Sequence, residues 1–183
     1  MSYTEKIKQR MIAGNFSKPD ELYPELINEI AEKKDAIVTL INSLFNQSDI
    51  DSVVDVGGGR GDLLVNLASR IKTVVDKREF IPHYGIEYII EEYRPEHTAD
   101  TDLAIYSEFL HLFDEEEIKK IIDECQAKRI VVIENKYDDF LDLRLRLWSN
   151  GRCIEPEYIT RLMGTAPFIV NDYNVWIKEN NNG

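Results

Sequence analysis

The sequence predicts an α/β fold in which a mostly parallel sheet carries helices on both faces and ends in an antiparallel hairpin. Two observations predict this fold class. From residue 52 onwards, short apolar segments typical of buried strands alternate with segments that have the three- and four-residue spacing of amphipathic helices. Near the end of the chain, "PFIVNDYNVWIK" indicates two strands joined by an Asn-Asp turn.

The part of the chain before the first strand is expected to be helical. Apolar residues recur at helical spacing over residues 20–46, and a shorter helix is expected over residues 4–12. Ser17, with Asp20 three residues later, is typical of a helix start. The predicted organisation is a helical extension at 1–50, a sheet domain at 51–179 and a disordered tail at 180–183.

The elements of the sheet domain follow from their apolar patterns. Strands are expected at 52–56, 73–75, 103–106 and 130–133, and helices at 62–71, 115–124 and 155–163. Residues 84–93 are ambiguous, because Ile86, Tyr88 and Ile90 alternate as in a strand while Ile86, Ile89 and Tyr93 also fit a helix. The third strand of the sheet is therefore not located by the pattern.

Composition limits the classes of partner. The 183 residues are 43% hydrophobic, which suits one domain with a packed core. The formal net charge of −12 repels phosphate backbones, and no dense basic patch offsets it, so no nucleic-acid partner is expected. No apolar run approaches about 18 residues, and the polar start is unlike a secretory signal, so no membrane partner is expected.

Cysteine and histidine usage points to a reduced protein without a metal. Cys125 and Cys153 form neither a disulfide framework nor a metal-ligand spacing. His83, His97 and His111 share no ligand spacing either, so no metal is expected. A cytoplasmic location is the expectation that follows.

The segment "VVDVGGGRGDLL", residues 53–64, holds four of the nine glycines of the chain. It closes the first strand and opens a helix, the place where open α/β sheets bind ligands. Glycines there permit positive φ and a close approach of the backbone. A dinucleotide loop would need a third glycine where Asp62 stands, and the lysine of a P-loop is missing. The common phosphate-binding patterns are therefore not met.

The pattern that is met, D-x-G-x-G-x-G, comprises Asp55, Gly57, Gly59 and Gly61. It resembles the first motif of the class I S-adenosylmethionine-dependent methyltransferases. This resemblance covers about residues 50–178 and implies a Rossmann-like seven-stranded sheet, a methyltransferase-like domain at 51–179 and S-adenosyl-L-methionine as the cofactor. It also implies that Asp55 and the three glycines bind the cofactor, with Asp55 serving its zwitterionic amino-acid end.

The same resemblance assigns further cofactor-binding residues. Asp76 ends the second strand, about 20 residues after Gly57, where the family has an acid that accepts from the ribose hydroxyls. Glu91 or Glu92 is the candidate for the acid that contacts adenine, and Glu92 is the residue we choose. Ser107 is the small polar residue at the end of the fourth-strand segment "DLAIYSEFLHLF".

Within the family, the segment that follows Ser107 is most similar to small-molecule O-methyltransferases, in which a histidine after leucine is the general base. His111 after Leu110 occupies that position, whereas Leu112 and Phe113 replace a polar residue and a tryptophan. His111 is therefore either the catalytic base or a packing or substrate-lining residue. The segment "RIVVIEN" resembles the fifth strand of the family and ends at Glu134.

Two functions follow from the resemblance. The first is S-adenosylmethionine-dependent methyl transfer to a small-molecule acceptor, with a hydroxyl as the acceptor group. The alternative is a catalytically inactive methyltransferase-like binding or partner subunit, which the altered flank of His111 and the acidity favour. A nicotinamide oxidoreductase is disfavoured by the missing third glycine. Because the relatives dimerise through an N-terminal domain, a homodimer through the N-terminal helices is also expected.

Overall fold

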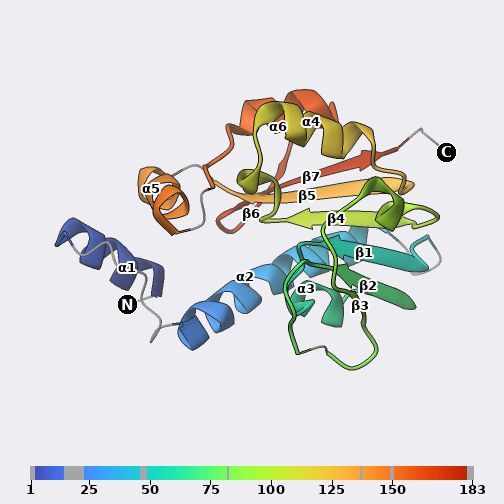
Figure 1. The fold of residues 1–183 in the computed structure, drawn as a ribbon, viewed down its shortest axis with the longest axis horizontal. Helices are drawn as coiled ribbons and strands as arrows, with labels where there is room; N and C mark the ends of the chain where they lie inside the picture. The colour runs from blue at the N-terminus through green and yellow to red at the C-terminus, as the bar shows by residue number, and fades with distance from the viewer. Residues whose placement is uncertain are drawn as a thin grey trace.

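The chain forms a seven-stranded sheet flanked by helices, shown in Figure 1. The computed structural model describes residues 3–14, 23–45, 49–81, 83–136, 138–148 and 151–180. The strands are β1 Ser52–Val56, β2 Ile71–Val75, β3 Glu87–Ile89, β4 Leu103–Ser107, β5 Arg129–Asn135, β6 Phe168–Val170 and β7 Tyr173–Glu179. The helices are α1 Tyr3–Ile12, α2 Tyr23–Leu44, α3 Asp62–Val65, α4 Glu115–Asp123, α5 Asp139–Trp148 and α6 Pro156–Met163.

The strand order is β3-β2-β1-β4-β5-β7-β6. The five strands from β3 to β5 run parallel, and β7 pairs antiparallel with both β5 and β6. Asn171, with φ at +54°, lies in the two-residue turn between β6 and β7. The predicted Rossmann-like, mostly parallel seven-stranded sheet with a C-terminal antiparallel hairpin is thus confirmed.

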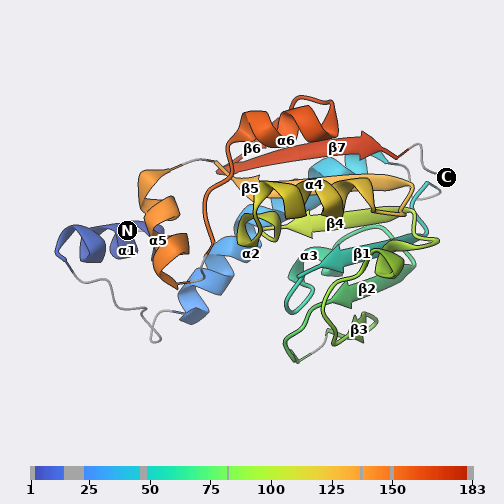
Figure 2. The same cartoon turned by 45° about the horizontal axis from the view of Figure 1, so that its top comes forward.

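Helices cover both faces of the sheet because the central strands are buried on both sides. On one face, Val54 and Tyr106 pack with Ile118 of α4 and Ile159 of α6. On the other face, β-strand neighbours of opposite direction pack against α2 and α3, in a cluster that includes Ile37, Ile41, Val53, Leu63, Leu64 and Ile105. Figure 2 shows α4 and α6 together on one side of the sheet and α3 on the other.

The third strand, which the pattern left unplaced, is β3, and the alternation of Ile86, Tyr88 and Ile90 was its signal. It pairs with β2 at the edge of the sheet. The helix expected over 62–71 is shorter than predicted, because α3 ends at Val65. The backbone N–H groups of Arg70 and Ile71 both donate to the carbonyl of Asp51, which turns the chain into β2 instead.

The N-terminal segments form α1 and α2, in agreement with the two expected helices, and the expected helix start at Ser17 and Asp20 lies outside the described residues. At the other end, Asn180 donates from its side chain to the carbonyls of Cys125 and Ala127, at 2.7 and 2.9 Å. Residues 181–183 lie outside the described residues. None of the described helices combines the length and apolarity that a membrane crossing requires.

Candidate functional site

The glycine loop lies at the carboxyl ends of β1 and β4, and its three predicted glycines all have positive φ: +70° at Gly57, +58° at Gly59 and +75° at Gly61. A Cβ on Gly57 would lie 2.5 Å from the Phe109 ring, so that this glycine is required by packing. A Cβ on Gly59 would meet nothing closer than a ring atom of Phe80 at 3.9 Å. Gly59 therefore faces the open side of the loop.

A small cavity of about 50 Å³ opens beside this loop. Its lining residues are Lys34, Asp55, Gly57, Gly58, Asp62, Leu63 and Ser107. Two buried oxygens there, Oδ1 of Asp55 and Oγ of Ser107, have no hydrogen-bond partner among the described residues. Because a buried polar atom without a partner is costly, these two oxygens mark a place where a ligand with polar groups is stabilised.

The electrostatics of the cavity depend on Lys34 and Asp55. Burial raises the pKa of Asp55 from 3.8 to about 7, although the charge of Lys34 opposes the shift. For Lys34, burial alone would lower the pKa, but the negative charges of Glu108 and Asp55 outweigh it and the pKa is raised. Nζ of Lys34 lies 3.0 Å from Oε2 of Glu108. The cavity thus holds a cation and a carboxylate that titrates near neutral pH.

Asp76 is buried and directed at the glycine loop, but its carboxylate is already engaged. Oδ2 accepts from the backbone N–H of Gly59 at 3.2 Å. Arg78 donates to the same carboxylate from its backbone at 2.9 Å, and from Nε and Nη2 at 3.2 Å each. The Arg78 side chain is 64% exposed and lies 5.1 Å from the centre of the Phe80 ring. A ligand hydroxyl can reach Asp76 only when this guanidinium moves away.

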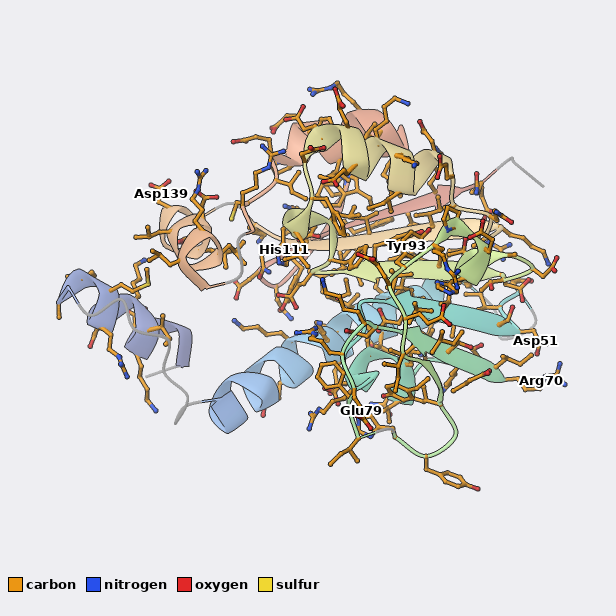
Figure 3. The ribbon with its side chains drawn as sticks, in the orientation of Figure 1. Asp51, Arg70, Glu79, Tyr93, His111 and Asp139 are labelled. Atoms are coloured by element: carbon orange, nitrogen blue, oxygen red, sulfur yellow. The ribbon has the colours of Figure 1, made fainter. Side chains whose placement is uncertain are left out.

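His111 lies in the 3₁₀ helix Leu110–Leu112 that follows β4, at the end of that strand facing α5 (Figure 3). Its Nδ1 lies 3.2 Å from Oε2 of Glu134, and Oε1 of Glu134 accepts from the backbone N–H of Leu110 at 2.9 Å. Both His111 and Glu134 are buried. Glu134 therefore fixes the orientation of the imidazole, as a carboxylate does for a histidine base.

A second, larger cavity of about 470 Å³ opens at His111. It is lined by His111, Leu112, Phe113, Asp114, Arg146, Gly151 and Arg152. Ser107 lines the first cavity and His111 the second, so the four-residue connection after β4 separates the two. This is the arrangement that a donor site and an acceptor site on either side of a short segment would have.

The structure brings together most of the predicted site residues. Asp55, Gly57 and Ser107 line one cavity. Gly59, Gly61 and Asp76 adjoin it through the loop. Glu92 is exposed on the coil after β3, and its neighbour Glu91 pairs with Arg94. Among the described residues no group of three or more His, Cys, Asp and Glu side chains could hold a metal ion.

Three residues of the site were missed by the sequence reasoning: Lys34, Arg78 and Glu134. A signal existed for Lys34, because it lies four residues after Ile30 and three before Ile37 and so stands on the apolar stripe of its helix. A charged residue on such a stripe needs a buried partner. For Arg78 and Glu134 the sequence carries no signal of which side chain they would contact.

No family model matches the sequence, and no curated protein matches it either. The fold is that of class I S-adenosylmethionine-dependent methyltransferases, as its similarity to solved structures shows. Mitomycin 7-O-methyltransferase is 16% identical with a TM-score of 0.63, over 98% of this chain and 61% of that one. An O-methyltransferase from neocarzinostatin biosynthesis, solved with S-adenosylmethionine and 2-hydroxy-5-methyl naphthoic acid, is 18% identical with a TM-score of 0.62, over 98% and 62%.

A third similar structure has nearly the length of this chain. Magnesium protoporphyrin IX methyltransferase from Synechocystis PCC 6803, solved with S-adenosylmethionine, is 13% identical with a TM-score of 0.62, over 96% of this chain and 91% of that one. The chain spans only about three fifths of the length of the two O-methyltransferases.

Proposed function

We propose that this protein transfers a methyl group from S-adenosyl-L-methionine to a hydroxyl of a small-molecule acceptor. The observation that carries the proposal is the pair of unpartnered buried oxygens, on Asp55 and Ser107, in a cavity at the glycine loop. The similarity in fold to methyltransferases solved with this cofactor supports it. Fold alone does not establish an activity, so the site residues have to carry the argument.

The donor set of the first cavity fits the amino-acid end of the cofactor. That end is a zwitterion, and Lys34 offers a cation for its carboxylate while Asp55 and Ser107 offer acceptors for its ammonium group. At the other end, Asp76 offers a carboxylate for the ribose hydroxyls once Arg78 gives it up. We assign Glu92 to the adenine, since it follows β3, the strand beside β2.

When bound, the cofactor supplies a methyl group activated by a positively charged sulfur, which keeps the electron pair of the carbon–sulfur bond. The residues of the chain then have to align an acceptor and take its proton. Because Glu134 accepts from Nδ1–H of His111, Nε2 is the basic nitrogen of the neutral ring. An acceptor hydroxyl in the larger cavity gives its proton to Nε2 as its oxygen attacks the methyl carbon. Glu134 stabilises the resulting imidazolium until solvent takes the proton.

The second candidate is a catalytically inactive binding protein with the same fold. The contacts of Arg78 favour it, because they occupy the carboxylate of Asp76. The 50 Å³ volume of the first cavity, far below that of the whole cofactor, favours it too. In this second reading His111 and Glu134 are a buried structural pair.

Binding and turnover separate these functions. We expect S-adenosylmethionine and its demethylated product, each at 100 times its dissociation constant, to stabilise the protein by about 2.7 kcal/mol, whereas NAD has no effect. Thermal unfolding measures this. A methyl-transfer assay on phenols then compares the wild type with His111→Ala. Stabilisation without turnover identifies the binding protein, and stabilisation by NAD alone refutes both functions.

Location and assembly belong to the same proposal. Cys125 and Cys153 are both free thiols, which fits a reducing, cytoplasmic compartment. Ile12 of α1 is 67% exposed, and we propose that such apolar side chains of the N-terminal helices bury themselves in a homodimer. Sedimentation analysis tests the homodimer, and a monomer at every concentration excludes it.

A further inference from the structure

We infer that the acceptor carries an anionic group, such as an aromatic carboxylate, and that Arg152 binds this group at the His111 cavity. The inference rests on the proposed function, because it names the substrate class of the same site. It is carried by the size and lining of the cavity, by the position of Arg152 and by the charges around it.

The cavity suits a small ring compound. Its volume of about 470 Å³ lies within the range of small-molecule pockets. Leu112 and Phe113 supply apolar lining, and the Phe113 ring lies 4.9 Å from the ring of Phe109. Aromatic and aliphatic walls of this kind bury a flat apolar body and leave recognition to a few polar groups.

Arg152 is held in a fixed position relative to His111. Its backbone N–H donates to the carbonyl of His111 at 2.9 Å. The backbone N–H of the next residue, Cys153, donates to Oδ1 of Asp142 at 2.8 Å, which fastens the same segment to α5. A group bound by the guanidinium of Arg152 would therefore keep a constant distance from the imidazole.

The charges around the cavity leave Arg152 able to bind an anion. Its ion pair with Glu115 is long, with Nη2 3.9 Å from Oε1, and the Glu115 side chain is 63% exposed. The one acidic lining residue, Asp114, accepts from the backbone N–H of Glu117 at 2.9 Å. Arg146, whose Nε lies 2.7 Å from Oδ2 of Asp142, adds a second positive charge to the lining.

A guanidinium is well matched to a carboxylate because its planar fork donates two parallel hydrogen bonds. In a chain of net charge −12, an anionic molecule is repelled by most of the surface. A cavity with two arginines in its lining is therefore a place where such a molecule gains the most. Binding through the acid group would leave a ring hydroxyl to meet His111, which fits the proton transfer proposed above.

The experiment compares charged and neutral probes of the same shape. Isothermal titration measures the binding of ortho-, meta- and para-hydroxybenzoate and of the three matching hydroxybenzamides, with and without S-adenosylhomocysteine. The proteins are the wild type, Arg152→Gln and Arg70→Gln. Arg70 is a matched control, because it is 75% exposed, pairs with Asp51 and lies at the far edge of the sheet from His111 in Figure 3.

We expect the wild type to bind at least one acid about tenfold more tightly than its amide, and this ratio to fall as salt rises from about 0.02 to about 0.3 M. Arg152→Gln should bring the ratio close to one, and Arg70→Gln should leave it unchanged. An equal affinity for acid and amide, an unchanged ratio in folded Arg152→Gln, or no binding of any acid overturns the inference. If Arg152→Gln does not fold, the wild-type ratio and its salt dependence decide.

This test is independent of the proposed function. If S-adenosylhomocysteine fails to bind, the proposed methyl transfer is refuted, whereas the acid-to-amide ratio without it still tests the anion site. If S-adenosylhomocysteine binds but the ratio is one, methyl transfer stands and the anionic acceptor is refuted.

Discussion

Replacing Asp55 with Asn should change the pH dependence of stability in a defined direction. Asp55 is 1% exposed, and burial raises its pKa from 3.8 to about 7. A raised pKa means that the folded state holds the proton more tightly than the unfolded state. Wild-type stability is therefore lost as the pH rises from about 4 towards 7, and the full penalty is present above pH 7. The Asn variant carries no ionisable group there and escapes this loss.

The size of the effect follows from the two pKa values. A pKa unit corresponds to about 1.4 kcal/mol, so that the shift from 3.8 to about 7 amounts to about 4 kcal/mol at high pH. Part of this penalty already exists at pH 5. Between pH 5 and pH 8 the wild type should lose roughly 2–3 kcal/mol of unfolding free energy relative to Asp55→Asn. Any pH-independent cost of the amide cancels in this difference.

Urea unfolding of both proteins at pH 5, 6, 7 and 8 measures the difference, and Asp102→Asn is the matched control. Although burial alone would raise the pKa of Asp102, hydrogen bonds from Lys128 and Ser52 hold it at about 2. Its stabilisation is present above pH 4 and lost only in acid, so Asp102→Asn should lower stability equally from pH 5 to pH 8. Parallel curves for the wild type and Asp55→Asn would refute the assignment of a neutral-range carboxyl at the cavity.

Two further predictions concern the loop and its cover. Arg78→Ala should tighten S-adenosylhomocysteine binding by at most about fivefold, because it frees Asp76 from an exposed ion pair worth about 1 kcal/mol or less; weaker binding by calorimetry would show that Arg78 assists the ligand instead. Gly57→Ala should lower the unfolding free energy by about 3 kcal/mol or more, because of the Phe109 ring and a positive φ, whereas Gly59→Ala has the positive φ alone and should lose about 1–2 kcal/mol. Equal losses in urea unfolding would contradict this account of the loop.

The sequence located best the elements that are buried on both faces. The first strand was expected at 52–56 and is observed at Ser52–Val56, because a continuous apolar run leaves a central strand little freedom. β3 could not be placed, since it is a three-residue edge strand whose Glu87 is exposed and whose neighbours fit two periodicities. The end of α3 was also missed, because it depends on hydrogen bonds to Asp51, far away in the sheet.

The site shows the same division between local and distant information. Asp55, the glycines and Asp76 belong to one strand–loop–helix–strand unit, so their spacing predicted that they would lie together. Lys34 and Glu134 reach the two cavities from α2 and β5, and only the packing of the whole fold brings them there. Arg78 is two residues from Asp76, but the direction of a long surface side chain is not encoded in the spacing.

The position of β7 between β5 and β6 has a consequence for synthesis on the ribosome. β5 emerges well before β7, and its buried segment from Ile130 to Ile133 keeps an unpaired edge until residues 173–179 follow. Exposed apolar edges recruit strands from other chains. A stalled or prematurely terminated chain that ends in α6 should therefore aggregate, while a few more seconds of elongation close the sheet and remove the hazard.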